Sequence, residues 1–279
     1  MKNKKMSKVI TLCADDFGQN TAICEGILAL AALKRINAIS CLVNFPAWFE
    51  HYAELMTLPD SCAIGLHFNL TCGQALSDPW RSQIGGTFAG LSNLIQKTSM
   101  RAFDPHVIHA ELKAQLMTFI ETMDRHPDFI DGHQHVHQLP QVRDALIRLY
   151  QDEGLSCRVR KTHNGCSDQW PRLGFFKVQA LAWLGGRRFS SLLSRSNIPS
   201  YAHFSGVYSF SGAKNYRRAM QSFLAHTRDG GLIMCHPGLA SDDRDDAIRA
   251  SRPLEWAYLM SEAFDDDLAK ASCTRSTTP

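Results

Sequence analysis

Short apolar runs rich in β-branched residues alternate along the chain with longer stretches in which apolar positions recur at helical spacing. The apolar runs predict buried strands at residues 8–16, 38–44, 63–70, 127–135, 156–161 and 230–238. The helical spacing predicts helices at residues 21–35, 48–56, 106–126, 141–154, 215–227 and 253–267, the first capped by Asn20 or Thr21. Such alternation predicts an α/β fold with a mainly parallel sheet and right-handed crossovers.

Residues 1–264 carry this alternation without a repeat or a linker, so we expect a single domain there. The segment 164–212 fits the alternation poorly. It contains a helical period at residues 175–195 and otherwise resembles an irregular insertion that could form a lid or a substrate loop. Residues 265–279 form a polar C-terminal tail, of which the last part, residues 269–279, is expected to be disordered.

Composition narrows the class of protein. The chain has 279 residues, is 44% hydrophobic, and carries a net charge of only +3 with scattered Lys and Arg, which argues against nucleic-acid and membrane partners. The sequence shows no signal peptide and no apolar run of membrane-spanning length. Its nine cysteines form no Cys-x-x-Cys pair, and several lie in apolar runs, so we expect free thiols and a cytoplasmic location.

Acids and histidines stand at or near the ends of four predicted strands, in "ITLCADDFG", "IGLHFNLT", "DGHQHVH" and "LIMCHPG". The residues concerned are Asp15, Asp16, His67, Asp131, His133, His135, His137 and His236. Each alone has an ordinary explanation, such as a helix cap, a surface histidine or a turn. Together they indicate a site, because the carboxyl ends of parallel strands form one face. Two imidazoles and a carboxylate are a common ligand set for a divalent ion in a hydrolase.

The local spacing suggests which of these groups bind the metal and which act as a base. Neighbouring residues on a strand point to opposite sides, so a bend would let Asp15 or Asp16 bind the metal while the other stays free as a general base. The histidines at 133, 135 and 137 alternate, which on an extended strand would place them on one side. Arg158 and Arg160 also alternate. One of them could pair with Asp15, grip a substrate, or form a surface salt bridge.

The motifs "ADDFGQN", "GLHFNLT", "DGHQHVHQLP" and "MCHPG", which span residues 14–238, resemble those of the YdjC/ChbG-like carbohydrate deacetylases. That family includes diacetylchitobiose deacetylases and hopanoid-associated relatives. The resemblance implies a (β/α) barrel-like fold, one divalent metal ion, zinc or magnesium, and hydrolysis of an N-acetyl group from an amino sugar or a short N-acetylated oligosaccharide. Gly132 and Gln134 depart from the residues that relatives often carry, and neither is an expected ligand.

Carried over to this chain, the resemblance implies that Asp16, His67 and His133 are the metal ligands. It implies that Asp15 is the catalytic base and that His236 assists on the opposite side of the reaction. The groups expected to orient ligands or contact substrate are Asp131, His135, His137 and Arg160.

Other functions stay open at this point. One is a metal-dependent hydrolase of a different amide, ester or phosphate-ester bond, and another is a non-catalytic sugar-binding relative. A two-carboxylate glycosidase would not need these histidines. The expected partner is a small N-acetylated sugar, with a homodimer left open.

Overall fold

Eight parallel strands form the centre of the molecule. A computed structural model describes residues 7–163, 185–210 and 213–276. The strands are β1 (Lys8–Phe17), β2 (Ala38–Cys41), β3 (Ala63–Phe68), β4 (Phe129–Gly132), β5 (Arg158–Val159), β6 (Phe204–Ser205), β7 (Gly231–Cys235) and β8 (Cys273–Arg275). Seven of them pair in the order β5-β4-β3-β2-β1-β7-β6, and β8 adds to the start of β1.

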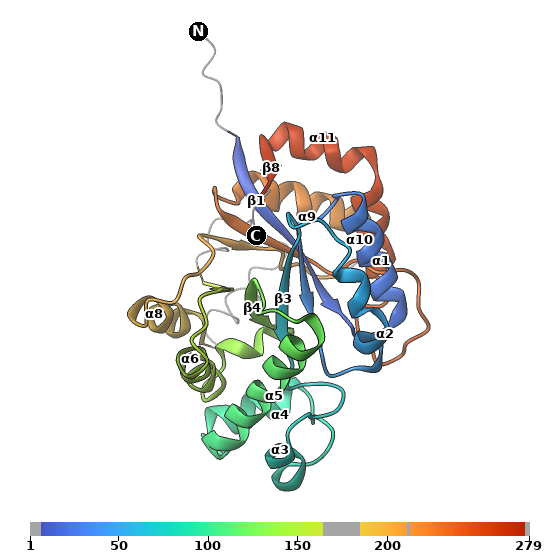
Figure 1. Cartoon of the computed structure of the whole chain (residues 1–279). Coiled ribbons are helices and arrows are strands. Elements are labelled where there is room, and N and C mark those ends of the chain that lie inside the picture. Colours follow the sequence, from blue (N-terminus) through green and yellow to red (C-terminus); the bar gives the residue numbers. More distant parts are fainter. Residues whose placement is uncertain (1–6, 164–184, 211–212, 277–279) are drawn as a thin grey trace.

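Helices surround this sheet (Figure 1). They are α1 (Thr21–Ala32), α2 (Pro46–Leu55), α3 (Asp78–Gln83), α4 (Leu91–Ser99), α5 (Pro105–Met123), α6 (Val142–Asp152), α8 (Arg187–Arg195), α9 (Ala213–His226), α10 (Arg252–Met260) and α11 (Glu262–Ala271). Local chemistry sets several of their starts. The Asn20 side chain accepts a hydrogen bond from the Ile23 amide and caps α1, and α2 and α5 begin with proline.

The sheet curls into a barrel-like shape. Alternate strand residues point inward and, with Tyr201 from the segment before β6, form a small cluster of their own. The strand residues are Cys13, Ala38, Ala63, Phe129, Phe204, Leu232 and Met234. The intervening residues, such as Leu12 and Ala14, pack outward against the helices. On the far side, a parallel bridge between Val159 and Ser200 joins the ring within the described part of the chain. The predicted α/β barrel-like fold with parallel strands is confirmed.

The C-terminal region differs from the prediction. Residues 253–267 were expected to form one helix, but Ser261 is extended (φ −84°, ψ 156°) and separates α10 from α11. The prediction that residues 269–279 are disordered is also wrong for residues 269–276, because α11 continues to Ala271 and β8 then pairs with β1. Pairing with a buried strand supplies the order that this polar sequence does not reveal locally.

The segment 164–212 is more regular than predicted where the structure describes it. Residues 185–210 contain α8, which agrees with part of the helical period seen in the sequence, and the short strand β6. Residues 164–184 and 211–212, on which the prediction of a lid or substrate loop also rests, lie outside the described residues.

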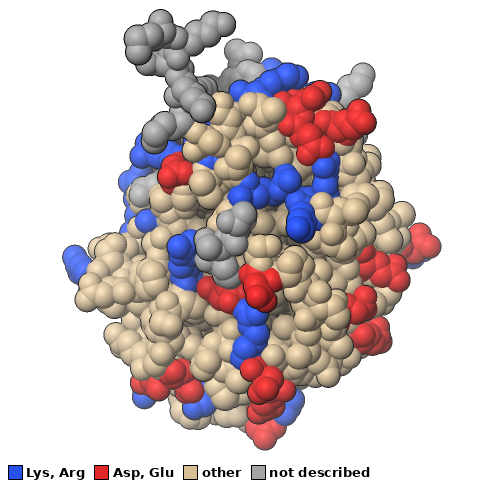
Figure 2. Space-filling model, turned by 45° about the horizontal axis from the view of Figure 1, so that its top comes forward, with Lys and Arg blue, Asp and Glu red and all other residues tan. Residues whose placement is uncertain are grey.

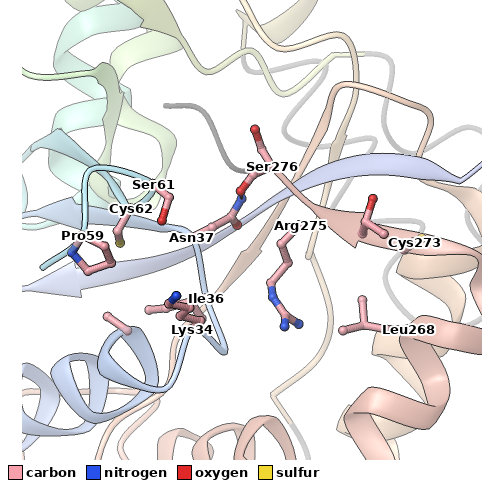
Figure 3. A pocket seen from close by; sticks show the side chains of 12 residues that line it. Lys34, Ile36, Asn37, Pro59, Ser61, Cys62, Leu268, Cys273, Arg275 and Ser276 are labelled. Atoms are coloured by element: carbon pink, nitrogen blue, oxygen red, sulfur yellow. Dashed lines mark hydrogen bonds between the residues drawn. The ribbon is translucent and has the colours of Figure 1, made fainter.

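The surface carries mixed charge and a hollow that lies away from the strand-end acids and histidines. Basic and acidic side chains are interspersed on the face shown in Figure 2, which fits the net charge of +3. A hollow of about 370 Å³, shown in Figure 3, is lined by residues that include Asn37, Cys62 and Arg275. Asn37 and Cys62 stand just before the amino ends of β2 and β3, and Arg275 belongs to β8. The hollow therefore lies at the opposite end of the barrel from the strand-end acids and histidines. Among the described helices, none has the length and apolar character needed to cross a bilayer.

Candidate metal centre

A bend at the end of β1 separates the two neighbouring acids. Asp16 has a positive φ of 72°, which is unusual for a residue other than glycine, and the register between β1 and β2 shifts between Ala14 and Phe17. The carboxylate of Asp15 therefore points to Arg160, whereas that of Asp16 points to histidines of β3 and of the segment after β4. Strained backbone at a strand end is common at functional sites.

Asp16, His67 and His133 come together as the sequence predicted. The Asp16 Oδ1 atom lies 2.8 Å from His133 Nδ1 and 3.5 Å from His67 Nε2. One donor atom from each of the three residues lies within 4.8 Å of the other two. Asp16 and His67 are almost fully buried, at 1% and 2% exposure, so these donors face one another rather than solvent.

The electrostatics of this cluster fit a bound cation. Burial alone would lower the pKa of each imidazole, but Asp131 and Asp15 raise the pKa of His67 to about 9. For His133, the Asp16 carboxylate outweighs burial and raises the pKa to about 10. Both rings thus reside where positive charge is strongly favoured. A carboxylate and two imidazoles of this arrangement suit a divalent ion such as zinc.

The β3 histidine is oriented by a carboxylate on its other side. His67 Nδ1 lies 2.5 Å from Asp131 Oδ1, and the Ser40 hydroxyl donates to the same oxygen. A carboxylate behind a histidine ligand fixes the ring and its tautomer, so Asp131 takes the kind of orienting position that the sequence predicted for it. Sequence reasoning missed Ser40, although a polar residue inside the apolar strand 38–44 was a usable signal.

Asp15 is paired with a cation rather than free. Arg160 Nη1 and Nη2 lie 2.6 and 2.7 Å from the two Asp15 oxygens, and Nη2 is also 2.6 Å from Asp131. Burial would raise the pKa of Asp15, but the Arg160 guanidinium outweighs it and holds that pKa well below its usual range. Of the two alternating arginines, Arg160 therefore makes the pair, while Arg158 stacks over Tyr201 at 5.6 Å. Asp15 thus stays outside the Asp16–His67–His133 group, and its pairing with Arg160 is one of the options that the alternating arginines left open.

Cys13, Asp15 and Asp131 also place donor atoms within 4.8 Å of one another. Arg160 already fills this cluster, because Nη2 contacts the Cys13 sulfur at 3.2 Å as well as both carboxylates. The cluster is thus an arginine site and not a second metal site.

His236 follows β7 and enters the same end of the barrel. Its backbone amide donates to Glu255 Oε2 at 2.7 Å, and its ring contacts Phe210 at 5.3 Å between centroids. An electrostatic interaction with the His236 side chain also contributes to the lowered pKa of Asp15. The Nδ1 atom of His236 is buried and has no hydrogen-bond partner among the described residues.

The three alternating histidines do not lie on one side of a strand. β4 ends at Gly132, and residues His133–Gln138 form a 3₁₀ turn in which Gln134 and His135 have positive φ values of 51° and 60°. Only His133 reaches Asp16. His135 packs on Phe204 at 5.5 Å, and His137 is buried with Nε2 donating to the Arg160 carbonyl at 2.9 Å. The prediction that all three share a face is wrong because the strand stops before the first of them.

Two further residues touch the predicted ligands and were not found from the sequence. Cys72, in the loop after β3, interacts with His133 and raises the pKa of its imidazole. Arg252, at the first position of α10, lies 2.8 Å from Asp16 Oδ2. Neither had a local signal, because a lone cysteine in a loop and an arginine before a proline are ordinary surface patterns.

Known structures resemble this fold. A protein of Enterococcus faecalis V583, described as a candidate cellobiose-phosphate cleavage protein, matches with a TM-score of 0.70 at 18% identity over 97% of each chain. A polysaccharide deacetylase of Bacillus cereus matches at 12% identity with a TM-score of 0.46, covering 97% of this chain and 91% of that one. A family 4 carbohydrate esterase of Streptomyces lividans matches at 7% identity with a TM-score of 0.47, covering 96% and 91%.

The sequence itself matches a family model. The model of YdjC-like proteins aligns with residues 9–270, which contain every strand-end acid and histidine described above. The match confirms the resemblance seen in the four motifs and supports the expected enzyme class, a carbohydrate deacetylase. The chain belongs to the YdjC-like family.

Proposed function

We propose that this protein is a metal-dependent carbohydrate deacetylase that removes an N-acetyl group from an amino sugar or a short chitin-type oligosaccharide and releases acetate. The observation that carries the proposal is the convergence of Asp16, His67 and His133 within 4.8 Å, at the barrel end that also holds Asp15 and His236. A set of metal ligands beside a carboxylate and an imidazole provides the groups that metal-dependent amide hydrolysis requires. The likeness of the motifs to diacetylchitobiose deacetylases supports the choice of sugar.

The proposed roles follow from these positions. Asp16, His67 and His133 would hold one divalent ion, zinc or magnesium, which when bound supplies Lewis acidity toward the acetamide carbonyl. Asp15 accepts a proton from the water that adds to the carbonyl carbon. His236 donates a proton to the nitrogen as the carbon–nitrogen bond breaks, because an amine leaves poorly without one. The products are acetate and the free amino sugar.

The contact with Arg160 shapes the role of Asp15. Because its pKa is held low, Asp15 is ionised at neutral pH, so its oxygens can accept a hydrogen bond from water, although the pairing also makes it a weaker base than a free carboxylate. An ionised carboxylate offers about four lone-pair sites, so two bonds to Arg160 leave capacity for a water molecule. Arg160 is buried and also contacts Asp131, which ties the proposed base to the carboxylate behind His67.

Acetate release from N-acetylated chitooligosaccharides tests the proposal. We expect release by the metal-loaded protein, loss after complete chelation, and recovery when zinc or magnesium is returned. Asp16→Asn should lose both metal binding and activity, whereas Asp15→Asn should lose activity and still bind the ion. Release that persists at the full rate without metal would contradict the proposed chemistry.

The cysteines support a proposal about the compartment. All eight cysteines in the described part of the chain are free, and six of them are buried. Unpaired buried thiols fit a reducing environment, so we propose a cytoplasmic location.

A further inference from the structure

The two oxygens of Asp16 face different partners. Oδ1 faces the imidazoles of His133 and His67, at 2.8 and 3.5 Å. Oδ2 faces away from them and accepts a hydrogen bond from Arg252 Nη2 at 2.8 Å. The carboxylate is thus divided between a metal-facing oxygen and an arginine-facing oxygen.

Arg252 is itself held on several sides. Its Nε lies 2.6 Å from Asp246 Oδ2, its Nη2 lies 3.2 Å from Asp246 Oδ1, and Nη2 also contacts Gln19 Oε1 at 3.3 Å. Arg252, Asp246 and Asp16 are 2%, 3% and 1% exposed. A buried guanidinium fixed by a second carboxylate cannot swing away from Asp16 at little cost.

The first turn of α10 also reaches the other half of the site. The Arg252 carbonyl accepts from the Gly238 amide in the loop after His236, and Glu255, one turn later on the helix, accepts from the His236 amide at 2.7 Å. One helical turn therefore positions both the metal-facing carboxylate and the segment that carries the proposed proton donor.

We propose that Arg252 is a positioning residue that makes Asp16 a ligand through Oδ1 alone and thereby sets which divalent ion the centre prefers. The proposal rests on the metal centre of the proposed function. The guanidinium that Asp246 holds in place occupies Oδ2 with a hydrogen bond, which keeps that oxygen from binding the ion. Large or oxygen-preferring ions gain from a carboxylate that binds with both oxygens, whereas zinc is satisfied by few donors. Arg252 therefore favours zinc over ions such as Mn²⁺.

Metal binding to Arg252→Gln and Arg252→Lys tests this inference without relying on activity. Metal-free protein is titrated with Zn²⁺ and with Mn²⁺ in competition with a chromophoric chelator. Both substitutions should lower the ratio of Zn²⁺ to Mn²⁺ affinity by roughly 10- to 100-fold, because lysine keeps the charge but cannot bridge Asp246 and Asp16. Visible absorption of the Co²⁺ form should weaken in both variants as the second Asp16 oxygen raises the coordination number.

The controls separate the explanations. Arg217→Gln removes an arginine–carboxylate pair of similar length, 2.9 Å to Asp267 on α11, and should leave the ratio and the Co²⁺ spectrum at wild-type values. Asp246→Asn releases the far end of Arg252 and should shift both in the same direction by less, which keeps the test decisive if Arg252→Gln does not fold.

Two results would overturn the inference. One is an unchanged ratio and spectrum in the variants that fold. The other is equal tightening of both ions in Arg252→Gln with wild-type behaviour in Arg252→Lys, which would show a role of charge alone. Failure of the wild-type protein to bind any divalent ion would instead refute the proposed function.

Discussion

Asp15 and Asp16 are adjacent and chemically identical, yet their surroundings give them different tasks. Asp15 is bound through both oxygens by Arg160, which stabilises its charged form. Asp16 divides its oxygens between two imidazoles and Arg252. The sequence showed that a bend would be needed to separate the two side chains. It could not show which arginines receive them, because Arg160 and Arg252 lie 145 and 236 residues away along the chain.

The histidine at 137 makes stability depend on pH. Burial lowers its pKa to about 4 from the ordinary 6.5, and the Arg160 charge adds to that effect against Asp131. Between pH 6.5 and about 4 the unfolded chain binds a proton at this residue that the folded chain does not, so lowering the pH favours unfolding. The stability that depends on a neutral His137 is fully present above pH 6.5. The free energy of unfolding should fall by up to ~3 kcal/mol as the pH falls to 4.

The measurement is urea unfolding between pH 4.5 and 7.5 for the wild-type protein and His137→Gln. The difference in unfolding free energy between them should shrink toward acid pH, because the variant has no titrating ring at this position. Curves that stay parallel across the range would contradict a buried neutral His137.

At the scale of elements, sequence periodicity located most strands and helices but missed what long-range contacts decide. β1, β3 and β7 are continuous apolar runs and were predicted to within a few residues. The turn after β4 was predicted as strand because "DGHQHVH" alternates, yet Gln134 and His135 adopt positive φ values that only the surrounding fold can stabilise. The break at Ser261 likewise lacks glycine or proline, the usual local signals.

The turn that ends β1 depends on glycine. Gly18 has φ +95°, and a Cβ there would lie 2.3 Å from the Leu42 carbonyl oxygen. Gly18→Ala should therefore combine backbone strain with overlap and destabilise the protein by about 2–4 kcal/mol in thermal or urea unfolding. Gly90→Ala is the matched control, because Gly90 has φ +87° but nothing within 4 Å of the added carbon. Equal losses in the two variants would show that close packing at Gly18 adds nothing.

At the scale of the whole molecule, chemistry and structural support occupy opposite ends of the barrel. The acids and histidines lie at or just after the carboxyl ends of β1, β3, β4 and β7, whereas β8 and the hollow around Arg275 lie at the amino ends (Figures 1 and 3). The parallel sheet predicted from the sequence implied the first half of this arrangement. Nothing in the polar C-terminal sequence indicated that it would pair with β1.

Truncation after Ala271 tests the separation of the two ends. It removes β8 together with the hydrogen bonds Lys8 N–H to Ser272 and Ser276 N–H to Ile10. The melting temperature should fall by about 2–6 °C, since one to two kcal/mol shifts a domain of this size by that amount. Zn²⁺ affinity should stay at the wild-type value. An unchanged melting temperature, or a matching loss of Zn²⁺ binding, would contradict this division.

Among the described residues, the ring of strands is joined between β5 and Ser200 by few backbone contacts, which affects where the barrel opens locally. β5 is two residues long, and beyond it the circle is completed by the Val159 amide donating to Pro199 and the bridge to Ser200. Partial openings of a native protein begin where few backbone bonds must break. The Val159 amide should therefore exchange its hydrogen with solvent earlier than that of Leu12 in the middle of β1. Fluctuations of the barrel would then widen this seam first, while the strand that carries Asp15 and Asp16 stays closed.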